Sequence, residues 1–140
     1  MTTSNPSVLS SHSKENIDWG FLRQEAQKVA HYGYAPYSQL YVGAAALTLQ
    51  GRLLVGCNVE NISYGLTLCA ECAIISQLYS SGGGSLIALS CLDRQGHILS
   101  PCGRCRQLLI EHAHQEMYID TPTHPQLLSQ LLPHPFTSWK

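Results

Sequence analysis

The chain has 140 residues, of which 44% are hydrophobic and 12% are charged, and its formal net charge at pH 7 is −1. This length suits one domain with a core of its own, so neither a metal ion nor disulfides are needed to hold the fold together. Because 8 Lys and Arg stand against 9 Asp and Glu, a basic field for phosphate backbones is excluded, and nucleic acid is not expected as a partner.

Residues 1–15 are rich in serine and lack apolar periodicity, so we expect a flexible leader followed by one domain over residues 16–140. The leader has neither the basic start nor the apolar core that export requires, and no run of about eighteen apolar residues follows it. We therefore expect a cytoplasmic protein with no membrane partner. In a reducing compartment, the six cysteines indicate metal binding or catalysis.

The first half of the domain predicts one helix and one β-hairpin. Apolar residues recur at helical spacing within residues 18–33, which indicates a helix. Two apolar runs follow, at residues 40–49 and 52–60. They are joined by Gln50-Gly51, a dipeptide that favours a turn between paired strands.

In the second half of the domain, helices and strands alternate. Residues 69–80 have helical spacing and precede three glycines, and residues 85–91 predict a buried strand. A helix is predicted to begin at the start of the segment 100–114, because Ser100 is a candidate N-cap and Pro101 suits the first helical position. The last two expected elements are a strand at residues 117–120 and a helix at residues 125–133. The predicted fold class is α/β, a single three-layer domain whose central mixed sheet is flanked by helices.

The cysteine spacing allows two kinds of zinc site. Cys69 and Cys72 lie three positions apart, and Cys102 and Cys105 repeat that spacing. Four thiolates would form a closed structural site, whereas three protein ligands leave the fourth position of a catalytic zinc to water. Helix starts at Cys69 and Cys102 would favour catalysis, because a positive helix end lowers the pKa of a thiol. At this point both kinds of site remain open.

Glu71 lies two residues after Cys69, where a carboxylate can take a proton from water and pass it on. "CAE" followed by "PCGRC" resembles the signature of zinc-dependent nucleoside and nucleobase deaminases. Four longer stretches resemble the small homotetrameric cytidine deaminases and occur in the order of that family: "YAPYSQLYVGAA", "GCNVENISYGLTLCAEC", "SPCGRCRQLL" and "LLPHPF". The resemblance covers most of residues 19–136.

The resemblance implies a zinc-dependent hydrolase that converts cytidine and 2′-deoxycytidine to uridine and 2′-deoxyuridine, releasing ammonia, as part of pyrimidine salvage. It implies one zinc ion per subunit, held by three thiolates: Cys69, Cys102 and Cys105. Glu71 would be the catalytic proton shuttle between water and N3 of the cytosine ring. The backbone N–H of Ala70 would orient the base.

The resemblance also assigns contacts to the nucleoside. Asn58 and Glu60 match a pair that hydrogen-bonds the ribose 3′-hydroxyl, and Tyr64 matches an aromatic residue of the pocket. Phe136 matches a ring that a neighbouring subunit contributes, which implies a homotetramer with active sites at its subunit interfaces. Without the resemblance, Asn58 and Glu60 would be a strand end that turns into a loop, and Phe136 a terminal core residue.

Two residues depart from the family pattern. Cys72 stands where many of these enzymes have an arginine that offsets the thiolate charge, and Arg104 could supply that charge from the second helix. Leu40 stands where the family usually has a phenylalanine against the pyrimidine ring, so we expect it to pack on the substrate without aromatic stacking. Cys57 and Cys91 lie in predicted strands and are expected to be small buried side chains.

Two alternative functions also fit parts of this sequence. A blasticidin-S-type aminonucleoside deaminase also resembles this sequence in "ILSPCGRCRQ" and in lacking arginine after the glutamate. The pair Asn58 and Glu60 favours ribose or 2′-deoxyribose nucleosides instead. The second alternative is a non-catalytic structural zinc protein with Cys72 as the fourth ligand, which would bind zinc but have no deaminase activity.

Overall fold

The computed structural model describes residues 14–138. The predicted leader lies outside this range, except that Lys14 and Glu15 already belong to a short 3-10 helix. The helical elements are η1 (Lys14–Asn16), α2 (Trp19–Ala30), η2 (Tyr64–Leu66), α3 (Ala70–Ser80), α4 (Gly103–Ile110) and α5 (Leu128–Leu131). The strands are β1 (Val42–Thr48), β2 (Leu53–Cys57), β3 (Leu86–Asp93), β4 (Ile98–Leu99), β5 (Ala113–Ile119) and β6 (Gln126–Leu127).

Within residues 14–138 these strands form a six-stranded sheet in the order β2-β1-β3-β5-β6, with β4 paired to β3. The pairs β1–β2 and β1–β3 are antiparallel, whereas β3–β5 is parallel, so the sheet is mixed. The predicted hairpin is confirmed, with Leu47 opposite Leu53 across the turn. Gly51 has a φ of 89°, in the left-handed region that glycine enters without steric cost.

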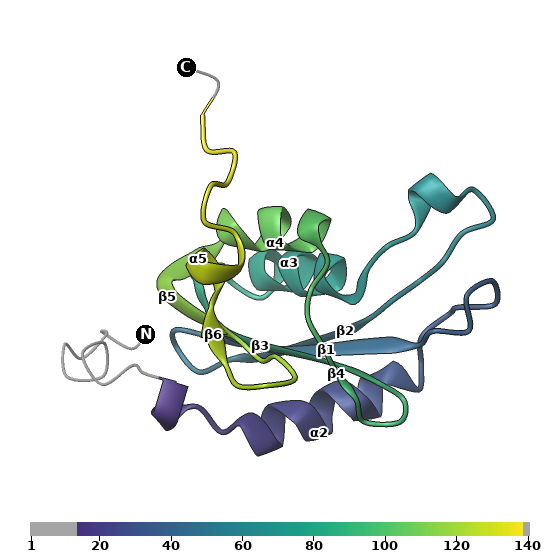
Figure 1. The fold of residues 1–140 in the computed structure, drawn as a ribbon, viewed down its shortest axis with the longest axis horizontal. Helices are drawn as coiled ribbons and strands as arrows, with labels where there is room; N and C mark the ends of the chain where they lie inside the picture. The colour runs from purple at the N-terminus through teal and green to yellow at the C-terminus, as the bar shows by residue number, and fades with distance from the viewer. Residues whose placement is uncertain (1–13, 139–140) are drawn as a thin grey trace.

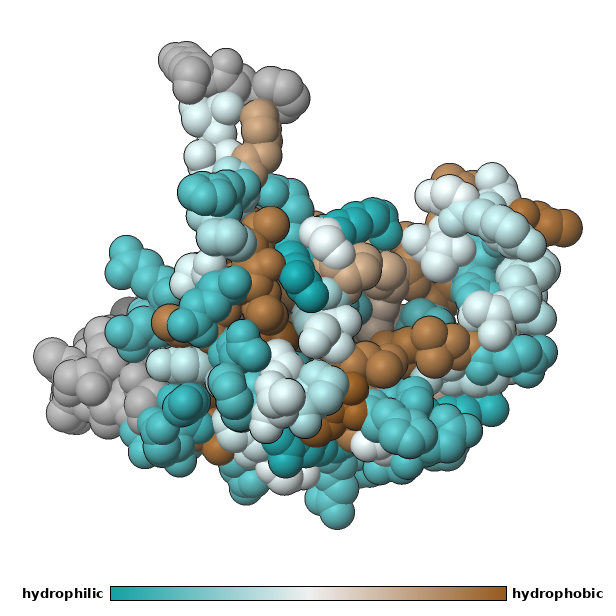
Figure 2. Space-filling view, viewed as in Figure 1, coloured by the Kyte–Doolittle hydropathy of each residue, from teal (hydrophilic) through white to brown (hydrophobic). Residues whose placement is uncertain are grey.

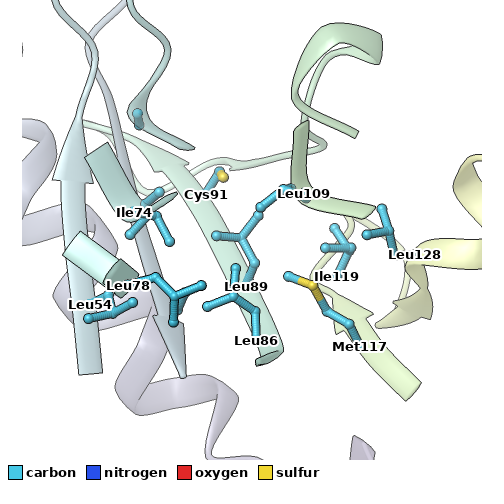
Figure 3. Packing of buried hydrophobic residues seen from close by; sticks show 13 residues of the cluster. Leu54, Ile74, Leu78, Leu86, Leu89, Cys91, Leu109, Met117, Ile119 and Leu128 are labelled. Carbon is cyan, nitrogen blue, oxygen red and sulfur yellow. The ribbon is translucent and has the colours of Figure 1, made fainter. Parts of the chain in front are cut away.

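Helices cover both faces of the sheet, as Figure 1 shows. The helix α2 lies on one face, and α3, α4 and α5 lie on the other. Each face has its own buried cluster: α2 packs with Leu22 and Ala26 against β1 and β3, while Ile74 and Leu78 of α3 join the larger cluster drawn in Figure 3. The predicted three-layer α/β fold is therefore confirmed.

Two glycines let the helices pack close to the central hairpin. A Cβ on Gly43 would lie 2.0 Å from the carbonyl oxygen of Ala26 in α2. A Cβ on Gly56 would lie 2.6 Å from the Cβ of Ala73 in α3. Because neither clash involves a flexible side-chain end, a larger residue would push a helix off the sheet. The tight packing of α3 fixes its N-terminus beside the end of β2, where the candidate site lies.

The predicted start of the second ligand-bearing helix is wrong by two residues. The N-cap is Cys102 and not Ser100, and Arg106 N donates to the Cys102 carbonyl at 2.9 Å as the first turn closes. Ser100 and Pro101 precede the helix because the chain just before them is extended, with Leu99 of β4 paired to Cys91 of β3. The shift brings the thiol of Cys102 to the helix end itself.

Three further boundaries differ from the sequence-based expectation. The strand expected at 117–120 begins at Ala113, because residues 113–119 join β3 in a parallel pair and α4 therefore ends at Ile110. Part of the helix expected at 125–133 is the strand β6, which pairs with β5, and only Leu128–Leu131 is helical. Strand pairing thus overrides helical spacing at both places.

Candidate active site

Three thiols meet where two helices begin. Cys69 is the N-cap of α3, Cys102 is the N-cap of α4, and Cys105 lies in the first turn of α4. Their Sγ atoms all lie within 4.8 Å of one another. The sequence-based expectation that Cys69 and Cys102 mark helix starts is confirmed. Two segments more than thirty residues apart in the chain therefore supply one compact set of sulfur ligands.

The three thiols differ in how readily they ionise, and the expected lowering of the pKa at the helix starts is found at Cys102 but not at Cys69. Desolvation raises the pKa of all three thiols, but at Cys102 hydrogen bonds from the backbone N–H of Cys105 and from neighbouring thiols outweigh it and lower the pKa. At Cys69 and Cys105, burial dominates and the pKa is raised in the metal-free chain. A cation at the centre of the three sulfurs would remove that penalty, because it favours the deprotonated form of each ligand.

The donor set fits zinc. Zinc binds cysteine sulfur readily, and three protein ligands are the number found in catalytic sites, where the fourth position stays open. Among the residues that the structure describes, Cys72 is not part of this thiol group. Its side chain instead lines a separate groove between α3 and α4, together with Arg104 and Gln107. The arrangement therefore favours an open three-thiolate site over a closed four-thiolate site.

Glu71 projects from the first turn of α3 into a cavity beside the thiols. Its side chain is almost fully buried, and the residue is 4% exposed. Burial raises the pKa of the carboxyl, and this is partly offset by hydrogen bonds from its own backbone N–H and from the thiols of Cys105 and Cys91. A carboxyl group with a raised pKa is suited to both accept and return a proton near neutral pH.

The cavity has a volume of about 250 Å³ and holds most of the predicted site residues. Its lining consists of Ser38, Leu40, Val42, Asn58, Glu60, Thr67, Cys69, Ala70, Glu71, Cys91, Leu99, Ser100 and Cys102. The thiols and Glu71 form one end, and the polar side chains of Asn58 and Glu60 belong to the other. An apolar cavity with a few converging polar groups is the usual form of a small-molecule site.

Asn58 and Glu60 are held by the segment that carries Leu40. The Asn58 amide accepts from Val42 N at 3.0 Å and donates to the Leu40 carbonyl at 2.8 Å. The Glu60 carboxylate accepts from the backbone N–H groups of Tyr37 and Ser38 at 3.0 and 3.2 Å. These contacts are absent from the sequence-based interpretation, which assigned Asn58 and Glu60 to the ligand alone.

Tyr64 and Phe136 do not line the cavity. Tyr64 lies in a neighbouring hollow with Tyr37, their ring centroids 5.8 Å apart, and Glu60 and Ser38 belong to both spaces. Phe136 is 56% exposed on the C-terminal segment. Its backbone is held by the Gln107 side chain of α4, which donates to the Phe136 carbonyl at 2.9 Å and accepts from its N–H at 3.0 Å.

Arg104 lies on the exposed side of the first turn of α4. Its guanidinium interacts electrostatically with the thiols of Cys72 and Cys69, and these negative partners raise its pKa. It therefore lies close enough to the thiol cluster to interact with it electrostatically. Cys72 and Arg104, the residue expected to supply the missing positive charge, line the same groove.

The segment after β2 forms a projecting arm, seen at the upper right of Figure 1. Its two ends are paired, because Val59 and Leu68 exchange backbone hydrogen bonds at 2.9 and 2.8 Å. Figure 2 shows hydrophobic surface on this arm. The large hydrophobic residues exposed on it are Val59, Ile62, Tyr64, Leu66 and Leu68.

Two residues of the cavity were missed as functional candidates. Cys91 was expected to be a small buried side chain, and it is 2% exposed, yet it also lines the cavity and contacts Glu71. Ser38 lies inside the stretch that carries the family resemblance but was given no role. Alternation along β3 could have placed Cys91 on a face with Leu89, but only the fold shows that this face meets α3.

In the part of the chain that the structure covers, no helix has the length and apolar character to cross a membrane.

Comparison with known proteins identifies the family. Residues 20–121 match the family model for the cytidine and deoxycytidylate deaminase zinc-binding region. The cytidine deaminase of Mycobacterium tuberculosis is 55% identical over 121 residues, which are 86% of this chain and 91% of that protein.

Solved structures agree with the sequence comparison. A crystal structure of cytidine deaminase from Mycobacterium tuberculosis matches at a TM-score of 0.85 with 54% identity, over 88% of this chain and 100% of that chain. Cytidine deaminase from Mycobacterium leprae matches at 0.83 with 51% identity, over 85% of this chain and 100% of that chain. The chain therefore belongs to the cytidine and deoxycytidylate deaminase family.

Proposed function

We propose that this protein catalyses the zinc-dependent hydrolytic deamination of cytidine and 2′-deoxycytidine to uridine and 2′-deoxyuridine, with release of ammonia, in pyrimidine salvage. The observation that carries the proposal is the position of the buried Glu71 carboxyl, which shares one small cavity with the thiols of Cys69 and Cys102. A zinc ion held by Cys69, Cys102 and Cys105 would supply Lewis-acid chemistry, since it lowers the pKa of water and so makes a nucleophile available near neutral pH.

Glu71 moves the protons of the reaction. Its carboxylate accepts a proton from the attacking water and delivers a proton to N3 of the cytosine ring, which makes C4 more electrophilic. The same carboxyl then helps the amine leave C4 as ammonia. Its raised pKa supports this role, because the carboxyl holds a proton at higher pH than a free glutamate does.

The other end of the cavity recognises the nucleoside. Asn58 and Glu60 bind the ribose 3′-hydroxyl, Leu40 packs on the pyrimidine ring, and the backbone N–H of Ala70 orients the base. The hydrogen bonds that already hold Glu60 occupy both lone pairs of Oε1 but only one of Oε2, so Oε2 can still accept from a sugar hydroxyl. A cavity of about 250 Å³ suits a nucleoside and not a polymer.

A homotetramer completes the site. Tyr64 and Phe136 are both largely exposed and lie outside the cavity lining, which supports their use at a subunit interface. The exposed hydrophobic residues of the projecting arm would be covered in the same assembly. Sedimentation of the zinc-loaded protein tests this, with a single species of four chains expected and a monomer contradicting it. We place the protein in the cytoplasm.

The function is tested by following the ultraviolet absorbance of cytidine, 2′-deoxycytidine and blasticidin S with zinc-loaded protein. We expect rapid loss of absorbance with the first two nucleosides and little with the third, because the sugar of blasticidin S lacks the hydroxyls that Asn58 and Glu60 would bind. Activity on blasticidin S alone would favour the aminonucleoside alternative. Zinc-replete protein that is inert on all three would support a structural zinc site.

A further inference from the structure

One hydroxyl group connects the two parts of the nucleoside-binding end of the cavity. Ser38 Oγ donates a hydrogen bond to Glu60 Oε2 and accepts one from the Leu40 backbone N–H at 3.0 Å. Ser38 also lines both the cavity and the neighbouring hollow. The Glu60 carboxylate and the Leu40 backbone therefore share the Ser38 hydroxyl as a hydrogen-bond partner.

The turn around Ser38 is not held by local backbone preference. Gln39 has a φ of 63°, a left-handed conformation that a residue with a long side chain adopts only when its surroundings impose it. The constraints come from both sides: Gln39 N donates to the Ala35 carbonyl at 3.0 Å, and the Leu40 carbonyl accepts from the Asn58 amide at 2.8 Å. The Leu40 N–H, in turn, donates a hydrogen bond to the Ser38 hydroxyl, so both backbone polar groups of Leu40 are held.

The Glu60 carboxylate depends on the same turn for all of its hydrogen bonds within the described residues. Oε1 accepts from the backbone N–H groups of Tyr37 and Ser38, and Oε2 accepts from the Ser38 hydroxyl. Without the hydroxyl, the carboxylate would keep the two hydrogen bonds to Oε1 but lose the contact that fixes the direction of Oε2. These hydrogen bonds also lower the pKa of Glu60, with the Ser38 hydroxyl as the largest cause, so the carboxylate stays charged at neutral pH.

We propose that Ser38 is a positioning residue for substrate specificity: its hydroxyl orients the Glu60 carboxylate and the Leu40 backbone together, and so determines how strongly the enzyme selects nucleosides that carry a sugar 3′-hydroxyl. The proposal rests on the proposed function, because it takes a pyrimidine nucleoside as the ligand. Ser38 does not touch the reacting atoms. Its effect should therefore be on KM and on substrate selection, and not on the chemical step.

The test compares zinc-loaded wild type and Ser38→Ala on two substrates, cytidine and 3′-deoxycytidine. For cytidine, we expect KM to rise about fivefold to tenfold with kcat within about twofold, the size expected for the net contribution of one ordinary hydrogen bond. For 3′-deoxycytidine, which lacks the hydroxyl that Glu60 would bind, KM should change by less than about twofold. Ser129→Ala, which alters an exposed serine of α5 outside the cavity, should leave both substrates unaffected.

Three results would overturn the proposal. The first is an unchanged KM for cytidine in Ser38→Ala. The second is an equal rise for both substrates, which would indicate a general structural role for the turn. The third is a full Ser38→Ala effect in a Glu60→Ala background, because the two changes should not add if Ser38 acts through Glu60. Failure of the proposed function looks different, since wild type itself would then be inactive on cytidine.

Discussion

The two ends of the cavity are built in different ways. At the catalytic end, Cys69, Glu71 and Cys105 lie on the first turns of two helices that are packed tightly against a sheet. At the recognition end, Leu40 and Glu60 lie on loops, and their positions depend on hydrogen bonds between side chains and backbone. Under the proposed function, the residues at the helix starts need a fixed geometry for the reaction. The residues on the loops bind the substrate, and their positions can differ more between related enzymes.

The construction of each end predicts how it responds to mutation. Rigid elements hold reacting groups more precisely than loops do. Because the reaction depends on that precision, changes at the catalytic end should abolish turnover. Changes at the recognition end should mainly alter KM.

The largest effect is expected from Glu71→Gln. The amide fills the same space but cannot take up or return a proton, so kcat should fall by roughly 10²–10⁴-fold while KM changes little. Steady-state kinetics on cytidine measures this, and zinc content by atomic absorption serves as the control, with one zinc per chain expected in both proteins. A variant that retains zinc and keeps more than a tenth of the wild-type kcat would contradict the assignment of Glu71.

Arg104→Gln should weaken zinc retention. The guanidinium interacts electrostatically with the thiols of Cys72 and Cys69 from the exposed side of α4, so we expect it to offset thiolate charge when zinc is bound. Loss of such a supporting partner typically lowers metal affinity about 10–100-fold. Competition with a chromogenic chelator measures the change. Cys72→Ser is the matched control in the same groove and should keep wild-type zinc affinity. Equal affinities in wild type and Arg104→Gln would rule out charge balancing by Arg104.

Leu40→Phe tests the recognition end. An aromatic ring facing the pyrimidine adds a stacking interaction worth about 0.5–1.5 kcal/mol, so KM for cytidine should fall about twofold to tenfold. We expect kcat to stay within about twofold, because Leu40 has no group that could bind zinc or transfer a proton. Identical KM values in the two proteins would show that this position does not contact the ring.

The smallest effect concerns stability in the metal-free protein. Since burial raises the pKa of Glu71, the folded chain holds a proton that the unfolded chain releases above about pH 4.3. The stabilisation is therefore complete below that value and is lost as pH rises through the folded pKa. Glu71→Gln removes this dependence, so the Tm of the variant minus that of wild type should grow as the pH rises above about 4.3. A difference that stays flat or shrinks would count against a raised pKa.

The catalytic end could be predicted from the sequence because its signals are local. Cysteine spacing, the glutamate beside Cys69 and the helical periodicity that follows all lie within a few residues of one another. The exact start of α4 was wrong, because Ser100 and Pro101 are good helix-start residues but follow the β4 strand. That pairing depends on β3, and local propensity does not reveal it.

The recognition end could not be predicted in the same way. The contact between Ser38 and Glu60 joins residues 22 positions apart, and it depends on the left-handed conformation of Gln39, which no glycine signals. Cys91 was correctly expected to be buried, but its contact with Glu71 requires knowing which face of β3 meets α3. In both cases the relevant partner comes from another element of the fold.

Hydrolytic deamination transfers an oxygen atom from water to C4 of the base, so it can be followed by isotope incorporation. Zinc-loaded protein is incubated with cytidine in water enriched in ¹⁸O, and the nucleoside product is analysed by mass spectrometry alongside an ammonia assay. The account predicts uridine carrying one ¹⁸O at C4 and one ammonia per uridine. Unchanged cytidine with zinc-replete protein, or uridine without the label, would contradict it.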